Sequence, residues 1–177
     1  MLAGPAMRPD RLTVMQGQAR VTDDDRVELT TVLGSCIACC LFDPSRNIGG
    51  MNHFLLAEPA GENGIDEYYG VYLMELLIND MLARGASRRT MRAHLYGGAD
   101  MHRGMTRIGA ANAAFARQFL HREHIPLVRS IVGGERARRV DFRAARGRAR
   151  CRRIDEPITA FPLVSRRHEA RGDVEFF

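Results

Sequence analysis

Two strand-length apolar segments joined by one strong turn constrain the fold of this chain more than any other feature. Residues 37–42 form a continuous apolar run, and the sequence Asp-Pro-Ser-Arg-Asn at 43–47 is a strong turn signal. A second apolar run, residues 48–56, then has the pattern of a returning strand. The two runs predict a pair of neighbouring antiparallel strands.

The hydrophobic period becomes helical after residue 69. Apolar residues repeat at helical spacing between 71 and 82, and Gly85 follows where a helix C-cap belongs. A second helix is predicted over residues 108–119. Further strands are predicted at 12–15, 27–32, 90–96 and 127–132, and a hairpin at 139–143 and 148–151. Runs of strands around two helices predict an α/β (α+β) fold, a mixed β-sheet with helices packed on it.

Length and composition fit a single soluble domain. We expect a flexible leader over residues 1–10, one domain over 11–165 and a tail over 166–177 of the 177 residues. The sequence has no signal-peptide pattern and no run of roughly 20 apolar residues that would span a bilayer. Three of the four cysteines are crowded between positions 36 and 40, which does not fit a disulfide framework. We therefore predict a cytoplasmic protein without membrane insertion.

Every one of the 26 basic residues is an arginine, and the net charge is +5. Codon bias explains the missing lysines more simply than function does. Half of the arginines lie between Arg129 and Arg171, which favours an acidic partner, either a protein or a nucleic acid. Aromatic residues for base stacking are scarce there, so we predict no nucleic-acid binding. The alternating residues Arg148, Arg150 and Arg152 instead fit one solvated face of an edge strand.

Cys36 stands at the head of the first apolar run, directly after Gly34 and Ser35. A cysteine in such a run is usually a small buried hydrophobic residue, an interpretation that we apply to Cys39, Cys40 and Cys151. Cys36 differs because glycine permits a close turn that presents the sulfur to solvent. Backbone N–H groups of this turn, such as those of Ser35 and Cys36, are then candidates for binding an oxyanion.

His53 lies in the second apolar run. If the two runs pair, the thiol and the imidazole meet, and a Cys/His pair is a nucleophile with its own base. A zinc site is the alternative, but a second pair of ligands is absent, and Cys36 and Cys39 point to opposite faces of a strand. We therefore predict no metal, and we expect structural roles for the other histidines, His94, His102, His121, His124 and His168.

Residues 30–56 resemble the CheD family, the glutamine deamidases that modify bacterial chemoreceptors. The shared pattern is Thr-x-x-Leu-Gly-Ser-Cys, then an Asp-containing turn and a histidine 17 residues beyond the cysteine. Its members in this sequence are Thr30, Leu33, Gly34, Ser35, Cys36, Asp43 and His53. Residues 95–101 and the Gly133-Gly134 pair followed by Arg138 are similar to later blocks of the family.

The resemblance implies roles for these residues. Cys36 is the nucleophile, His53 the base and Thr30 the residue that orients the histidine, although Thr31 is adjacent and the choice between the two threonines depends on strand register. A thiolate paired with protonated His53 attacks the amide of a receptor glutamine and forms a thioester, without a metal or organic cofactor. The implied architecture is a three-layer α/β/α sandwich, shared with deamidases of the cytotoxic necrotizing factor type.

The resemblance also implies partners. The substrates are methyl-accepting chemotaxis receptors, modified on their cytoplasmic helical domain, and a CheC-type phosphatase is a further binding partner. A non-catalytic chemotaxis adaptor is the alternative function, and the intact Cys36/His53 pair argues against it. The row Arg148, Arg150 and Arg152 is either a face that steers acidic receptors or an ordinary solvated surface.

Overall fold

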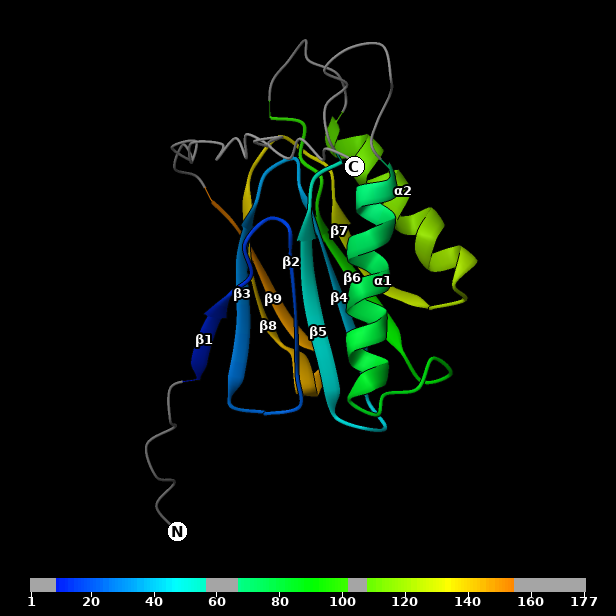
Figure 1. The fold of residues 1–177 in the computed structure, drawn as a ribbon. Coiled ribbons are helices and arrows are strands. Elements are labelled where there is room, and N and C mark those ends of the chain that lie inside the picture. Colours follow the sequence, from blue (N-terminus) through cyan, green and yellow to red (C-terminus); the bar gives the residue numbers. More distant parts are fainter. Residues whose placement is uncertain (1–8, 57–66, 102–107, 155–177) are drawn as a thin grey trace, which may run out of the picture.

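The computed structural model describes residues 9–56, 67–101 and 108–154 (Figure 1). The elements in these residues are β1 (Asp10–Thr13), β2 (Gln18–Thr22), β3 (Val27–Leu33), β4 (Ile37–Asp43), β5 (Ile48–Phe54), α1 (Glu67–Ala83), β6 (Arg92–Gly97), α2 (Ile108–Arg122), β7 (Leu127–Val132), β8 (Arg138–Arg143), the short 3₁₀ helix η1 (Ala144–Arg146) and β9 (Arg148–Arg153). Most of the expected leader and all of the expected tail lie outside the described residues.

The strands form two sheets that face one another. One sheet has the strand order β1-β3-β8-β9, and the other has the order β2-β5-β4-β6-β7. Strands β4 and β5 pair antiparallel as predicted, with Ala38 directly opposite His53. Both sheets are mixed, because β1 pairs with β3 and β6 pairs with β7 in parallel.

The continuous apolar run of β4 is explained by burial on both faces of that strand. Ile37, Cys39 and Leu41 pack in the core beneath the helices, whereas Ala38 and Cys40 pack in a second core between the two sheets. Side chains alternate across a strand, so a strand buried on both sides must be apolar at nearly every position. The first core contains most of the large helix residues, including Leu73, Leu77 and Phe119.

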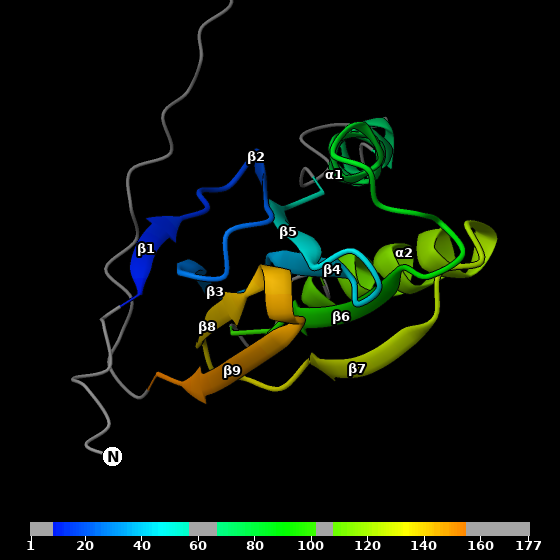
Figure 2. The ribbon, with the colours of Figure 1, turned by 90° about the horizontal axis from the view of Figure 1, so that it is seen from below.

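The α+β class, with mixed sheets and helices packed against one of them, is confirmed. The order of the layers differs from the expected helix–sheet–helix arrangement. Helices α1 and α2 both cover the same side of the five-stranded sheet, and the four-stranded sheet covers its other side (Figures 1 and 2). The reason is that β1, β3, β8 and β9 pair with one another and do not extend the five-stranded sheet.

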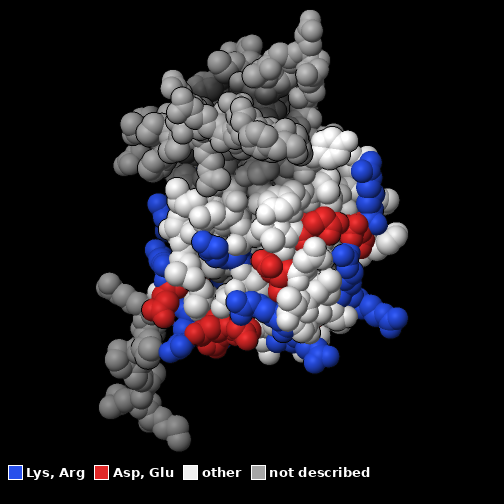
Figure 3. Space-filling view, viewed as in Figure 1, with Lys and Arg blue, Asp and Glu red and all other residues white. Residues whose placement is uncertain are grey.

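The arginine-rich strand β9 is an edge strand, as its alternating pattern predicts. Arg148, Arg150 and Arg152 are exposed, and Arg152 pairs with Asp141 at 2.8 Å. Acidic and basic side chains are interspersed on the face shown in Figure 3. That face therefore carries mixed charge and is not uniformly positive.

None of the helices in the described ranges is long and apolar enough to cross a membrane.

Candidate active site

A turn between β3 and β4 holds Cys36, and hydrogen bonds fix its backbone on one side. The carbonyl of Cys36 accepts a hydrogen bond from Gly98 N at 2.8 Å, and that of Gly34 accepts one from Ala99 N at 2.9 Å. The carbonyl of Ser35, between them, accepts one from Nδ2 of Asn112 at 2.9 Å. Asn112 is fully buried on α2 and also accepts from Leu56 N at 2.9 Å. The cysteine backbone is therefore tied to the end of β6 and to the second helix.

Gly97, the last residue of β6, permits this close approach. Its φ of +109° lies in the region that favours glycine, and a Cβ there would lie 2.1 Å from the carbonyl oxygen of Cys36. Any side chain at position 97 would push the turn away from the sheet. The Gly97-Gly98 pair thus supports the turn that carries Cys36, in addition to ending its own strand.

The thiol of Cys36 is partly exposed and has one hydrogen-bond acceptor. Its Sγ donates to Oε1 of Gln16 at 3.5 Å, and Gln16 lies exposed in the connection between β1 and β2. Burial raises the pKa of the thiol to about 11, although the backbone N–H of Cys36 itself, directed at the sulfur, acts in the opposite sense. That N–H remains a candidate donor for an oxyanion, as the sequence predicts.

His53 lies on the same face of the five-stranded sheet as Cys36. It is opposite Ala38, which is two residues from Cys36 and shares its side of the strand. The ring is 7% exposed, and Nε2 is buried without a hydrogen-bond partner among the described residues. A buried, unsatisfied ring nitrogen costs free energy, so its presence on the sheet face of a partly exposed thiol makes this a candidate functional site.

The other ring nitrogen fixes the tautomer of His53. Nδ1 lies 2.9 Å from Oγ1 of Thr31 and 3.2 Å from the carbonyl oxygen of Val14, and the Thr31 hydroxyl donates its proton to that same carbonyl at 2.8 Å. A carbonyl only accepts, and the hydroxyl proton is already used, so Nδ1 must carry the hydrogen. Nε2 then holds the lone pair and is the basic nitrogen.

Both pKa shifts favour the neutral forms of this pair. Burial lowers the pKa of His53, although the hydrogen bond to Val14 works in the other direction, and burial raises that of Cys36. These directions favour a neutral thiol and a neutral imidazole in the substrate-free site, in contrast to the expected thiolate–imidazolium pair.

The prediction that Thr30 orients His53 is wrong. The side chain of Thr30 points to the outer face of its sheet and donates to Oδ1 of Asp141 at 2.8 Å. Leu29 and Leu33 occupy the core between the sheets, and alternation along β3 places Thr31 on their side. Thr31 therefore contacts the imidazole.

Sequence reasoning missed three further contributors to the site. Gln16 reaches the thiol, the Val14 carbonyl fixes the ring, and Asn112 holds the turn. A backbone carbonyl leaves no signal in a sequence. Asn112 could have been found as an amide within an otherwise apolar helix face, whereas Gln16 looks like any polar loop residue.

Replacing each threonine separately tests the assignment of the orienting residue. Thr31→Val removes the acceptor for Nδ1–H but keeps the shape, and we expect kcat for amide hydrolysis to fall about tenfold, the value of one hydrogen bond of about 1.4 kcal/mol. Thr30→Val, the matched control on the opposite face, should leave kcat unchanged and lower only stability. Steady-state kinetics of both variants show which threonine orients His53. A larger kcat loss in Thr30→Val than in Thr31→Val would assign that role to Thr30.

The pH dependence of alkylation tests the neutral resting pair. Only the thiolate reacts, and the pKa of Cys36 is about 11, so alkylation of Cys36 by iodoacetamide should accelerate about tenfold per pH unit between roughly pH 7 and 10. Rates followed by mass spectrometry of the Cys36 peptide measure this directly. A rate already constant above pH 6 would reveal a preformed ion pair instead.

The remaining cysteines are placed away from this chemistry. Cys39 and Cys40 are fully buried, and burial raises the pKa of both thiols. Cys39 faces the helices while Cys36 faces the second sheet, so the two point to opposite faces as predicted. The described residues contain no group of three or more potential metal ligands.

Comparison with known proteins identifies the family. The model of the CheD chemotactic sensory transduction family matches residues 55–153. A protein of Zymomonas mobilis named "Probable chemoreceptor glutamine deamidase CheD" is 53% identical over 94% of this chain and 92% of its own length. The chain belongs to the CheD family.

Other comparisons agree with the CheD assignment or are more distant. A CheD protein of Caulobacter vibrioides with the same printed name is 50% identical over 96% of this chain and 95% of its own. Among solved structures, a DUF152-family protein of Neisseria meningitidis is 17% identical with a TM-score of 0.44, covering 66% of this chain and 53% of that one. The CheD family model begins at residue 55, so the match with whole CheD relatives, and not the model, extends over Cys36 and His53.

Proposed function

We propose that this CheD-family protein is a chemoreceptor glutamine deamidase, which hydrolyses the side-chain amide of receptor glutamines to glutamate. Relatives that are about half identical over nearly the whole chain carry that name. The observation that carries the proposal is the buried, unpartnered Nε2 of His53 on the same sheet face as the thiol of Cys36. Such a pair supplies a nucleophile and its base.

The first half of the reaction transfers the acyl group to the enzyme. As Sγ of Cys36 attacks the amide carbon, its proton moves to Nε2 of His53, and the carbonyl oxygen becomes an oxyanion facing the N–H of Cys36. His53 then returns that proton to the amide nitrogen. The C–N bond breaks, ammonia leaves, and a thioester remains on Cys36.

The second half releases the product. Nε2 of His53 takes a proton from water, the oxygen attacks the thioester carbon, and the thiolate leaves and recovers its proton from His53. The products are glutamate and ammonia, and Cys36 and His53 return to their neutral forms. Nδ1–H keeps its bonds to Thr31 and Val14 throughout, so the ring holds one orientation for each proton transfer.

The finer assignments follow from the family. We propose that the substrates are the cytoplasmic helical domains of methyl-accepting chemotaxis receptors, that the reaction takes place in the cytoplasm, and that a CheC-type phosphatase is a binding partner. The row Arg148, Arg150 and Arg152 is a weak candidate for steering, because Arg152 is already paired with Asp141.

Mass spectrometry of a receptor cytoplasmic fragment incubated with the protein tests the proposal. The expected result is conversion of particular glutamines to glutamate with one ammonia released for each. A fragment left unchanged by the protein, under conditions where circular dichroism shows both partners folded, would contradict the deamidase function and favour a binding role.

A further inference from the structure

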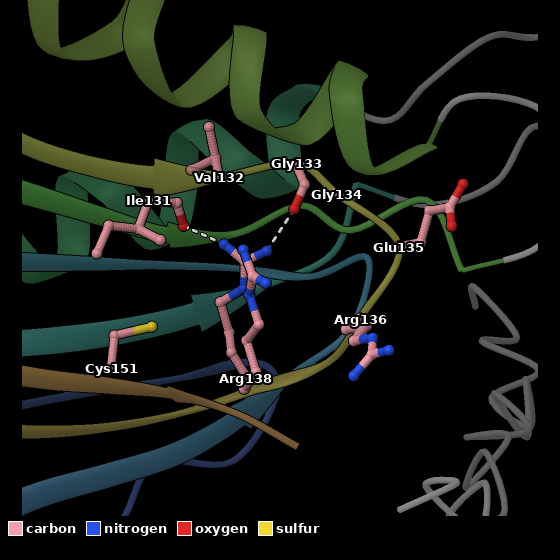
Figure 4. A pocket seen from close by; sticks show the side chains of 9 residues that line it. Ile131, Val132, Gly133, Gly134, Glu135, Arg136, Arg138 and Cys151 are labelled. Carbon is pink, nitrogen blue, oxygen red and sulfur yellow. Dashed lines mark hydrogen bonds between the residues drawn. The ribbon is translucent and has the colours of Figure 1, made fainter. Parts of the chain in front are cut away.

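A pocket of about 490 Å³ lies apart from the Cys36 thiol, between the end of β7 and the inner face of strands β8 and β9 (Figure 4). Its walls are the β7 end, the Gly133-Gly134 loop and three arginines, with the thiol of Cys151 on one side. The arginines are Arg136, Arg138 and Arg153. The deamidation steps described above use none of these groups.

Arg138 is the unusual member of this wall. Its side chain is among the buried charged groups, with 6% of the residue exposed, and it donates to the carbonyl oxygens of Ile131 and Gly133 (Figure 4). Its Nε is buried without a hydrogen-bond partner among the described residues. Backbone carbonyls carry no full charge, so the guanidinium charge stays uncompensated, which is expensive for a buried cation.

A second arginine stands directly across from it. Arg138 and Arg153 are register partners on the antiparallel strands β8 and β9, so both side chains leave the same face of the sheet. Like charges in this arrangement destabilise a sheet. No carboxylate in residues 9–56, 67–101 or 108–154 forms an ion pair with either, and Glu135, which also lines the pocket, points away from Arg138 (Figure 4).

The outer face of the same strand shows the contrast. There Arg152 is paired with Asp141, whose pKa is lowered because hydrogen bonds from Thr30 and Arg152 outweigh the effect of burial. Within residues 9–56, 67–101 and 108–154, a carboxylate thus pairs with exposed Arg152, whereas buried Arg138 and exposed Arg153 at the pocket have no such counter-ion. An anion that enters the pocket would supply the missing charge.

The pocket is linked to the candidate active site through the backbone. Gly133 N donates to the carbonyl of Gly97 at 3.0 Å, and Gly97 is the residue packed against the Cys36 carbonyl. Strand β6 lies between β4, which begins after Cys36, and β7, which ends at the pocket. Strands β4 and β7 are therefore two strand spacings apart, which is about 10 Å. Two residues separated by about two turns of a helix are a similar distance apart.

We propose that this pocket binds a carboxylate of the protein substrate, an acidic side chain about two helical turns from the glutamine, through Arg138 and Arg153. The identity of the ligand as part of the substrate rests on the proposed deamidase function. The existence of a carboxylate site does not, and the two are tested separately.

Cys151 provides a reporter inside the pocket. Iodoacetate carries a carboxylate and iodoacetamide is its neutral counterpart, so the ratio of their alkylation rates at Cys151 cancels the thiolate fraction and reports the attraction of the anion. We expect this ratio to fall about threefold to fivefold in Arg153→Gln, the effect of losing one exposed charge. Arg150→Gln, on the outer face of the same strand, is the matched control and should keep the ratio of the unchanged protein. Equal ratios in the two variants would overturn the carboxylate site.

The second experiment identifies the ligand. Arg153→Gln should raise KM for a receptor cytoplasmic fragment several-fold with little change in kcat, and the effect should vanish when the fragment's acidic residues within two helical turns of the modified glutamine are replaced by alanine. An effect of Arg153→Gln on KM that persists with the altered fragment would overturn the substrate side chain as ligand. If neither fragment is deamidated by the unchanged protein, the proposed function fails, and the alkylation ratio alone decides whether the pocket binds a carboxylate.

Discussion

Replacing Cys36 with alanine abolishes ammonia release from a receptor fragment, by a factor on the order of 10³ or more, while the chain keeps its fold. In the proposed reaction the sulfur forms the covalent bond to the acyl group. Among the described residues, the other thiol on that face of the five-stranded sheet is Cys40, which is fully buried. The change removes a partly exposed sulfur whose side-chain hydrogen bond goes to exposed Gln16, so the loss of stability should be small.

Cys40→Ala is the matched control for this result. Cys40 shares the sheet face of Cys36 but packs in the core between the sheets, so the variant should lose stability and retain turnover. Ammonia release and thermal unfolding, measured on both variants, separate chemistry from packing. Turnover retained by Cys36→Ala would exclude this cysteine as the nucleophile.

Replacing His53 with alanine should lower kcat by about 10²-fold to 10⁴-fold, the range expected for loss of a positioned general base. Among the described residues, Nε2 is a buried ring nitrogen without a hydrogen-bond partner, and it lies on the same sheet face as Cys36. The same atom must also protonate the departing ammonia, so both halves of the reaction lose their proton carrier. KM should change little, because in the proposed reaction His53 transfers protons and is not assigned to substrate binding.

His94 offers a control for the loss of a buried imidazole. It is 7% exposed, it packs against Phe42 and Phe142, and burial together with Arg129 lowers its pKa to about 4. Its register partner is Cys40, two residues further along β4 from Cys36 than Ala38, the partner of His53. His94→Phe should keep kcat within a few-fold of the unchanged protein. A kcat loss as large in His94→Phe as in His53→Ala would mean that both act through packing.

The sequence was sufficient to predict the hairpin of β4 and β5, both helices and the arginine-rich edge strand. Each has an unambiguous period and a turn residue at its end, which are local signals. Strand β2 was not predicted, because Gln18–Thr22 is short and largely polar. The division into two sheets was also out of reach, since it depends on which strands pair over long distances in the chain.

In the site, too, features set by adjacent segments were predictable from the sequence, and features set by contacts between the two sheets were not. Cys36 and His53 were predicted to share a sheet face, because one pairing of adjacent segments brings them together. The choice between Thr30 and Thr31 depended on which side of β3 meets the other sheet, and Leu29 and Leu33 decide that only once the sheets are stacked. The family resemblance pointed to Thr30, whereas the threonine that contacts the imidazole is the next residue, Thr31.

Because of the connection between β1 and β2, the proposed reaction requires a longer chain than the fold does. Val14 holds the imidazole, Gln16 meets the thiol, and Gly17 N donates to the His53 carbonyl at 2.7 Å, yet all four residues of β1 just before them are exposed. A shortened chain that began at Gln18 would keep the nucleophile, the base and nearly all of both cores. Its imidazole would be free to adopt the other tautomer, so a well-folded and correctly packed product would be catalytically incomplete.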